Sequence, residues 1–454
     1  MRELFSADRR YRMWRALWLS LAKAERALGL PITDGQIEAL SAHLVDIDYD
    51  LVAAREREVR HDVMAHVYAY GVAAPEAAGI IHLGATSCYV TDNTDLILYR
   101  EGLRIVREGL VGVIALLAAF ADKYKALPTL GYTHYQPAQL TTVGKRATLW
   151  LQDFVSDLEE VDFVLANLRF LGCRGTTGTE ASFLDLFDGD SAKIDEMNRL
   201  IAADFGFAEI YDVCGQTYPR KADSRVLNVL SAIAQSAYRM ANDIRLLQHD
   251  RQVEEPFETH QIGSSAMAYK RNPMRCERIC SLSRYLFADA LNAPLTASVQ
   301  WMERTLDDSA NRRIALPEAF LAADAILRLV RNVSDGLVVN EAIIARAVEE
   351  YLPFIATENL MMEAVKRGGD RQQIHEIIRV ASMQATARMK AGEPCDLVER
   401  LAAEPTFGLT AEEIGAMLDP ADYIGRSVEQ VEGYLAKLAP ITAGVVTSKV
   451  DITV

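Results

Sequence analysis

Eleven consecutive residues combine side chains suited to chemistry on an anion, and they run GSSAMAYKRNP over residues 263–273. They join a flexible Gly-Ser-Ser turn to a Lys-Arg pair and an Asn-Pro step. Because proline loses no hydrogen bond at the first helical position, the sequence predicts a helix that begins at Pro273. The open amides and the dipole at its N-terminus would favour an anionic ligand beside the loop. An ordinary solvated Ser/Lys/Arg loop fits the same residues.

A second candidate for chemistry is His134, which lies between Thr133 and a Tyr-Gln-Pro turn, ahead of a helix expected near Thr141. A histidine in such a loop can donate or accept a proton near neutral pH. A lone loop histidine is also common on polar surfaces. The residue by itself therefore leaves both roles open.

Long helices are predicted to position these loops. Apolar residues recur at spacings of three and four over residues 96–124 and 144–168, which is typical of long helices packed in a bundle. Further helices are expected over 222–250, 273–292 and 308–335, and strand-type alternation is scarce. We therefore expect an all-α, long-helix bundle, and its apolar seams favour an oligomer.

Polar, glycine-rich connectors separate the long helices at residues 81–87, 131–139, 172–179 and 254–272. Loops at the ends of rigid helices are a common place for reactive side chains. After about Asn340 the seams give way to shorter pieces broken by prolines. We expect three domains: an N-terminal helical domain (1–86), a central long-helix bundle that forms a tetramer core (87–339), and a C-terminal helical domain (340–454).

The charge of the chain limits its partners. Its 454 residues carry a net charge of −15, and an acidic surface repels nucleic acid and anionic membranes. We expect neither as a partner. Small anions can still bind where cations gather, as Lys270, Arg271, Arg275 and Arg278 do within nine residues. A merely solvated charged face is the alternative for that cluster.

The sequence contains no stretch typical of a membrane-spanning helix and no cysteine spacing typical of a metal site. The longest uncharged apolar stretch, residues 109–121, is shorter than the roughly 20 residues that cross a bilayer. The N-terminus has no signal-peptide run. Six cysteines lack CxxC or metal-type spacing. We expect a protein of the reducing cytoplasm, with no metal site and no disulfide framework.

The stretch 263–273 resembles the signature loop of the fumarase/aspartase/argininosuccinate lyase superfamily, whose pattern runs Gly-Ser-Ser-x-Met-Pro-x-Lys-x-Asn-Pro. Ala268 stands where the pattern has proline, so the loop is expected to be more flexible, with every reactive side chain kept. Residues 133–139 resemble the superfamily's Thr-x-x-Gln-x-Ala-Gln region. The histidine in this region places the chain with the adenylosuccinate and argininosuccinate lyases.

Longer segments resemble the adenylosuccinate lyases of the animal type over nearly the whole chain: residues 60–66, 82–95, 175–179, 215–218 and 301–313. The last of these matches that family rather than fumarase. The resemblance implies a homotetramer in which three subunits build each site. It implies a nucleotide monophosphate substrate that carries a succinyl group on nitrogen, and no metal or organic cofactor.

The implied reaction is β-elimination of fumarate from adenylosuccinate, leaving AMP, and from succinylaminoimidazole carboxamide ribotide, leaving AICAR. By resemblance Ser264 is the general base, His134 protonates the departing nitrogen, and Glu277 orients its imidazole. Lys270 and Asn272 would bind the carboxylate on which charge develops. A serine is a poor base unless its alkoxide is stabilised, which Lys270, the loop amides and the helix N-terminus could do.

The resemblance also implies a set of substrate-binding residues. They are Arg60, His61 (also counted as catalytic) and Asp62 near the succinyl and base end, Thr86, Ser87 and Gln216 as hydrogen-bond partners, and Arg278, Arg304, Ser309 and Arg313 at the nucleotide, its ribose and its phosphate. The animal-type enzymes carry an Arg-Tyr pair upstream of the position of Met1 here. Either the start codon has been placed late or another group serves in place of the pair. Without the pair we expect weaker phosphate binding, seen as a raised KM.

Two alternatives remain to this function. Another fumarate-releasing lyase, such as argininosuccinate lyase or aspartase, would share the loop, and a catalytically inactive helical scaffold would share the helices. The joint presence of Ser264, Lys270, His134 and Glu277 argues against the scaffold.

Overall fold

The computed structural model describes residues 1–447, 450 and 452, and most of them are helical, which confirms the predicted all-α class. The chain forms two compact units, each built from three segments. Unit 1 comprises Met1–Leu110, Ser156–Ala237 and Ser281–Leu327, and unit 2 comprises Val111–Val155, Tyr238–Cys280 and Arg328–Val454. The three-domain division at residues 86/87 and 339/340 stays a prediction.

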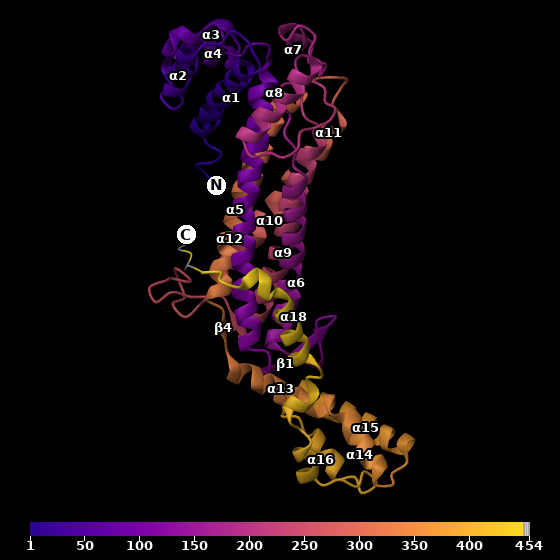
Figure 1. Ribbon diagram of the computed structural model, residues 1–454. Helices are drawn as coiled ribbons and strands as arrows, with labels where there is room; N and C mark the ends of the chain where they lie inside the picture. Colours follow the sequence, from indigo (N-terminus) through magenta and orange to yellow (C-terminus); the bar gives the residue numbers. More distant parts are fainter. Residues whose placement is uncertain (448–449, 451, 453–454) are drawn as a thin grey trace. The chain divides into compact units, whose positions relative to one another are not determined.

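Between residues 87 and 335, five of the described helices have 16 residues or more: α5 (Ser87–Lys123), α6 (Val143–Asn167), α9 (Lys221–His249), α10 (Met274–Asp289) and α12 (Asp307–Asp335) (Figure 1). All five were predicted, with ends within a few residues except at the start of α5. The predicted seam of α5 is buried, and Leu103, Leu110 and Leu117 have no exposed surface. In unit 1, Gly102 of α5 meets the ring of Phe320 of α12, and a Cβ there would lie 2.7 Å from it. The missing side chain lets these two helices pack closely.

Further helices complete unit 1: α1 (Ala7–Ala27), α2 (Asp34–Ala42), α3 (Tyr49–Val59), α4 (Asp62–Ala73), η1 (Pro75–Ala77), α7 (Ala181–Leu186), α8 (Ser191–Asp204) and α11 (Asn292–Ser298). Side chains cap the starts of α1, α2, α3, α4 and α8; Thr33 and Gln36, for example, form a reciprocal capping box on α2. α1 packs against α2 and α8 and buries Trp14 and Trp18. This packing holds one side of the cavity described below.

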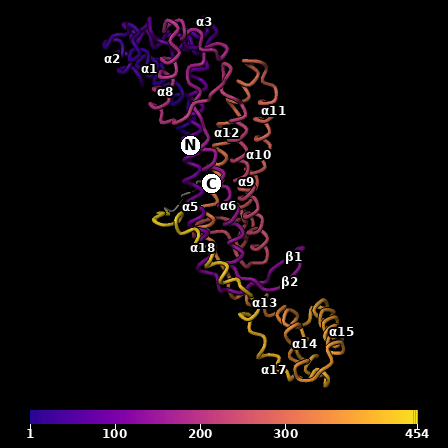
Figure 2. The backbone as a smooth tube through the Cα atoms, turned by 45° about the vertical axis from the view of Figure 1, so that its right-hand side comes forward, coloured from indigo at the N-terminus to yellow at the C-terminus, as the bar shows by residue number. Residues whose placement is uncertain are grey.

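Unit 2 contains the strands and the C-terminal helices: β1 (Pro128–Thr133), β2 (Gln136–Thr142), β3 (Val253–Glu254), β4 (Val338–Val339), α13 (Glu341–Ile355), α14 (Thr357–Lys366), α15 (Arg371–Lys390), α16 (Leu397–Ala402), α17 (Ala411–Ala416), η2 (Pro420–Tyr423) and α18 (Ser427–Thr442). β1 and β2 form an antiparallel hairpin that packs against α13 (Figure 2). Helices α14–α17 enclose an apolar core that includes Leu360, Ile374 and Phe407.

The β1–β2 hairpin differs from the loop that the sequence predicts around His134. Thr133 pairs with Gln136, so His134 and Tyr135 form a two-residue turn with φ of 53° and 58°. A turn of this type requires positive φ at both central residues. The following helix, expected near Thr141, begins at Val143, and the helix predicted from Pro273 begins at Met274.

Among the described residues, none of the helices is both long and apolar enough to span a bilayer.

A buried acid in unit 1 makes stability depend on pH. Glu25 of α1 has no exposed surface, and neither carboxyl oxygen has a hydrogen-bond partner among the described residues. Burial raises the pKa of Glu25 to about 8, from an ordinary value of 4.5. The folded state therefore keeps a proton that the unfolded state releases, and the folded state loses about 1.4 kcal/mol per pH unit between these two pKa values.

Glu25→Gln is expected to remove this loss, because an amide does not ionise. Its Tm relative to the unchanged protein should rise as the pH increases from about 4.5 to about 8, and should then level off. Thermal unfolding at several pH values measures the difference. Glu38→Gln on the exposed side of α2 is the matched control and should show no such trend. Parallel Tm profiles for Glu25→Gln and the unchanged protein would contradict the prediction.

Candidate active site

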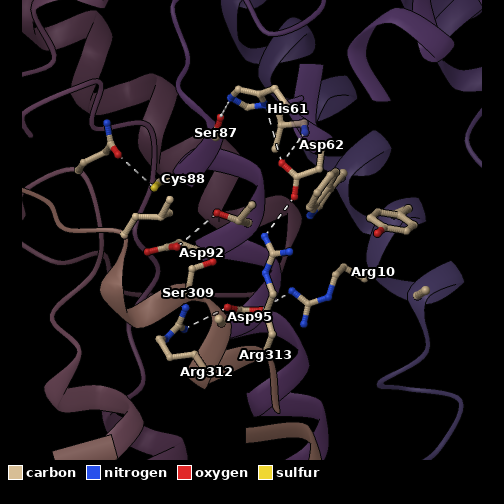
Figure 3. A pocket seen from close by; sticks show the side chains of 18 of the residues that line it. Arg10, His61, Asp62, Ser87, Cys88, Asp92, Asp95, Ser309, Arg312 and Arg313 are labelled. Atoms are coloured by element: carbon tan, nitrogen blue, oxygen red, sulfur yellow. Dashed lines mark hydrogen bonds and ion pairs between the residues drawn. The ribbon is translucent and has the colours of Figure 1, made fainter. Parts of the chain in front are cut away.

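A cavity of about 900 Å³ lies in unit 1, between α1, the α3–α4 junction, the start of α5 and the start of α12 (Figure 3). Its lining includes six arginines and four acids: Arg10, Arg60, Arg220, Arg304, Arg312, Arg313, Glu56, Asp62, Asp92 and Asp95. The excess of cations is notable in a chain of net charge −15. A local group of cations in a cleft raises the concentration of anionic ligands there.

The α3–α4 junction presents three consecutive predicted residues to this cavity. Arg60 ends α3 with a left-handed φ of 55°, a conformation that non-glycine residues seldom adopt away from functional or capping positions. His61 caps α4, because its Nδ1 accepts the amide N–H of Met64 at 3.3 Å. Its Nε2 faces the hydroxyl of Ser87 at 3.4 Å.

Asp62 links this junction to α12. Its Oδ2 accepts a hydrogen bond from Arg313 Nη2 at 3.1 Å, and its Oδ1 accepts the amide of Val63 at 2.8 Å. Arg313 is more than half exposed, so the pair is solvated and contributes little to stability. Its effect is to fix the direction of a cation at the rim of the cavity.

Gln216 reaches the cavity from the segment before α9. Its Nε2 donates to the carbonyl of Thr176 at 3.1 Å, and its amide N–H donates to the carbonyl of Glu303 at 3.0 Å. The glycine-rich segment closes tightly here, since a side chain on Gly178 (φ +81°) would clash with the carbonyl oxygen of Cys214. Gln216 is thus held between two backbone segments.

Three buried side chains and the partly exposed Arg304 form the first of two charged groups beneath the cavity, the Asp308 quartet. Arg220 bridges two carboxylates: its Nε donates to Asp308 at 2.6 Å, and its two terminal nitrogens donate to Asp92 at 2.8 and 3.2 Å. Arg304 Nη1 donates to the other oxygen of Asp308 at 2.8 Å. Loss of one partner from such a group leaves an uncompensated buried charge.

The second group is the Asp95 quartet. Arg312 bridges Asp223 and Asp95, with Nε and Nη2 donating at 2.6 and 3.0 Å respectively. Arg10 Nη1 donates to the other oxygen of Asp95 at 2.8 Å. Burial alone would raise the pKa of Asp95, but the Arg10 and Arg312 guanidiniums outweigh burial and hold that pKa below its ordinary value.

Most of the substrate-binding residues implied by the sequence line this one cavity: Arg60, His61, Asp62, Ser87, Gln216, Arg304, Ser309 and Arg313. Thr86 is absent from the lining, and its carbonyl accepts the amide of Tyr89 at 2.9 Å. Arg10, Asp92 and Asp95 also line the cavity and were not predicted as site residues. Asp92 and Asp95 are acidic residues three positions apart on an otherwise apolar helix face. That spacing was the sequence signal that could have indicated a functional role for the two aspartates.

The signature loop lies in unit 2. Ser264 Oγ accepts the amide N–H groups of Ala266 and Met267 at 3.3 and 3.1 Å. Asn272 Nδ2 donates to the carbonyl of Gly263 at 2.7 Å and closes the base of the loop. Lys270 is exposed. The loop thus folds back so that its own amides point at the serine oxygen.

The sequence predicts that the N-terminus of α10 is open to an anionic ligand, and this prediction is wrong. The carboxylate of Glu255, which is buried, accepts the amides of Arg275 and Cys276 at 3.0 and 2.9 Å. The amide of Met274 donates to the carbonyl of Asn272 at 2.8 Å. An internal carboxylate therefore satisfies the helix dipole and the free amides.

Glu277 of α10 lines a second cavity, of about 620 Å³, together with Arg245, His249 and Arg271. His134 lies exposed in its hairpin turn, and its ring has no hydrogen-bond partner among the described residues. Arg278 is exposed on α10. Within unit 2, then, His134 and Glu277 are not joined by a hydrogen bond.

Comparison with known proteins identifies the family. The chain matches the profile "Lyase" over residues 12–287 and the profile "Adenylosuccinate lyase C-terminus" over residues 353–434. It is 51% identical to the adenylosuccinate lyase of Schizosaccharomyces pombe, over 100% of this chain and 96% of the relative. It is 52% identical to that of Saccharomyces cerevisiae, over 96% and 92%.

A solved structure confirms the fold. The 3-carboxy-cis,cis-muconate lactonizing enzyme from Pseudomonas putida superposes with a TM-score of 0.84 over 97% of each chain, at 22% identity. The fold, the two profiles and the two relatives agree. The chain belongs to the adenylosuccinate lyase family.

Proposed function

We propose that this protein eliminates fumarate from adenylosuccinate, leaving AMP, and from succinylaminoimidazole carboxamide ribotide, leaving AICAR. The observation that carries the proposal is the pair of backbone amides aimed at Ser264 Oγ. The family of the chain supplies the substrate class.

Ser264 acts as the general base in this proposal. After its hydroxyl proton passes to water, its oxygen, now an alkoxide, removes the proton from the carbon beside a succinyl carboxylate, and the electron pair left behind is delocalised onto that carboxylate. Hydrogen bonds from two N–H groups favour the charged form of an oxygen, so the loop amides lower the cost of the alkoxide. Lys270 and Asn272 bind the carboxylate that gains charge.

His134 acts as the general acid. The electron pair of the C–N bond passes to the departing nitrogen as this bond breaks. The nitrogen takes up the proton from the imidazole of His134. The carbanion's electron pair forms the new C=C bond of fumarate. Glu277 orients the imidazole through its far ring nitrogen. The turn places His134 at an exposed tip, where it can reach into a site.

The arginine-rich cavity holds the substrate. We assign Arg60, His61 and Asp62 to its succinyl and base end, with His61 also assisting catalysis. The remaining assignments are Thr86, Ser87 and Gln216 as hydrogen-bond partners and Arg278, Arg304, Ser309 and Arg313 at the nucleotide, its ribose and its phosphate. The gathering of eight of these ten residues in one cavity supports the assignments.

We further propose a cytoplasmic homotetramer whose sites are shared between subunits. Large apolar side chains lie exposed on the long helices, including Phe163 of α6, Leu246 of α9 and Ile314 of α12. Exposed side chains of this kind are typical of surfaces that another subunit covers. All six cysteines are free, which fits a reducing compartment.

Arg304→Gln is expected to weaken binding more than it slows chemistry. Loss of a charge-assisted contact to phosphate should raise KM for adenylosuccinate and Ki for AMP by about tenfold to a hundredfold, while kcat changes little. Arg304→Lys keeps the charge, so its KM and Ki should lie between those of Arg304→Gln and those of the unchanged protein. Steady-state kinetics with AMP as inhibitor measure both constants. An unchanged KM with a collapsed kcat would contradict the assignment.

A panel of substrates tests the function. Purified protein is offered adenylosuccinate, succinylaminoimidazole carboxamide ribotide and argininosuccinate in parallel, and fumarate is quantified. The proposal predicts turnover of the first two and none of the third. Turnover of argininosuccinate alone would assign the other lyase, and no turnover by folded protein would favour the scaffold.

A further inference from the structure

The two quartets beneath the cavity share one architecture. Each contains two aspartates and two arginines, and in each a buried arginine bridges both carboxylates. Each also has a second arginine, which binds the outer oxygen of one aspartate and lines the cavity. That second arginine is Arg304 in the Asp308 quartet and Arg10 in the Asp95 quartet.

Arg304 and Arg10 are also alike in the exposure of their side chains and in their distance to the aspartate that each binds. The side chains of Arg304 and Arg10 are 21% and 23% exposed, whereas Arg220 and Arg312 are buried. Arg304 and Arg10 each make one contact of 2.8 Å to their aspartate. Both cations are therefore held from behind by a buried carboxylate and are open on the cavity side.

Most of the N–H donors of the Arg10 guanidinium have no partner among the described residues. A guanidinium carries five N–H groups, and among the described residues the side chain of Arg10 has only the single contact to Asp95. Asp95 does not depend on Arg10 alone, because Arg312 binds its other oxygen. An arginine fixed in this way loses little side-chain freedom when it binds an anion.

We propose that Arg10 is a further ligand-binding residue of this cavity, one that holds an anionic oxygen of the substrate as Arg304 does. The chemistry is a charge-assisted hydrogen bond from guanidinium to a phosphate or carboxylate oxygen. Asp95 positions Arg10 for this contact. The inference rests on the proposed function only for the identity of the anion.

The test is direct binding to the full-length protein. Arg10→Gln removes the charge while leaving Arg312 on Asp95. Calorimetric titrations with AMP and with succinate separate the two sources of the anionic oxygen, a phosphate and a dicarboxylate. The proposal predicts that Kd for one of them rises by about tenfold to a hundredfold. Unchanged Kd for both ligands would overturn it.

A matched control and a milder variant keep the result interpretable. Arg55 of α3 pairs with Glu58, is partly exposed and does not line the cavity, so Arg55→Gln should bind both ligands as the unchanged protein does. Arg10→Lys keeps the charge and should lie between Arg10→Gln and the unchanged protein. If Arg10→Gln fails to fold, an Arg10→Lys protein with unchanged Kd for both ligands overturns the proposal.

The experiments distinguish a failure of the proposed lyase function from a failure of the proposed role of Arg10. If the unchanged protein binds AMP or succinate but releases no fumarate from any substrate in the panel, the lyase assignment fails while Arg10 can still be tested. If the unchanged protein turns over adenylosuccinate and Arg10→Gln binds both ligands normally, only the role of Arg10 fails.

Discussion

Ser264→Ala is expected to lower kcat for adenylosuccinate by about 10²- to 10⁴-fold, the usual contribution of a general base. The variant removes the oxygen that accepts the two loop amides but leaves the arginine-rich cavity intact. Substrate binding and Tm should therefore change little. Stopped-flow absorbance and an AMP titration measure the two effects separately.

Ser265→Ala is the matched control for this prediction. Ser265 is exposed in the same loop, and its hydroxyl has no hydrogen-bond partner among the described residues. We expect near-normal turnover from it. If Ser264→Ala retained a near-normal kcat, or if Ser265→Ala lost as much, Ser264 would not be the base.

His134→Ala is expected to lower kcat by about 10²-fold or more, because the departing nitrogen would leave without a proton. The imidazole has no hydrogen-bond partner among the described residues, so its removal should leave the Tm unchanged. Added imidazole should restore part of the activity, since a free ring can occupy the vacated position. Turnover with and without imidazole is the measurement.

His375→Ala on the exposed face of α15 is the control for the histidine variant, and it should neither slow turnover nor respond to imidazole. Unaltered turnover in His134→Ala would assign the acid elsewhere. A loss of activity accompanied by a large drop in Tm would indicate that the turn, rather than proton transfer, had been damaged.

The long helices could be predicted from the sequence because their apolar spacing continues over many turns. The ends of α9 and α12 lie within one residue of the prediction. The β1–β2 hairpin was missed, because Thr133-His134-Tyr135-Gln136 has no glycine or asparagine to mark a turn with positive φ. The positive φ of His134 is imposed by strand pairing, which local residue preferences do not reveal.

The site was predictable only in part. The signature loop and the residues of the cavity rim were found through resemblance, whereas the Glu255 cap on α10 was not, since Glu255 precedes Arg275 by twenty residues. The Asp95 quartet was missed for the same reason. Arg10, Asp95 and Arg312 are far apart in the sequence, and only folding reveals that one aspartate binds both arginines.

We propose that Ser264 and His134 act as base and acid on one substrate in a site shared between subunits. Mixing Ser264→Ala with His134→Ala, with subunit exchange verified by native mass spectrometry, tests it most directly. If the two residues of each site come from different subunits, the mixture should regain about a quarter of the unchanged activity on adenylosuccinate, because random assembly rebuilds that share of intact sites. A mixture that exchanges subunits and stays as inactive as either variant alone would contradict the claim.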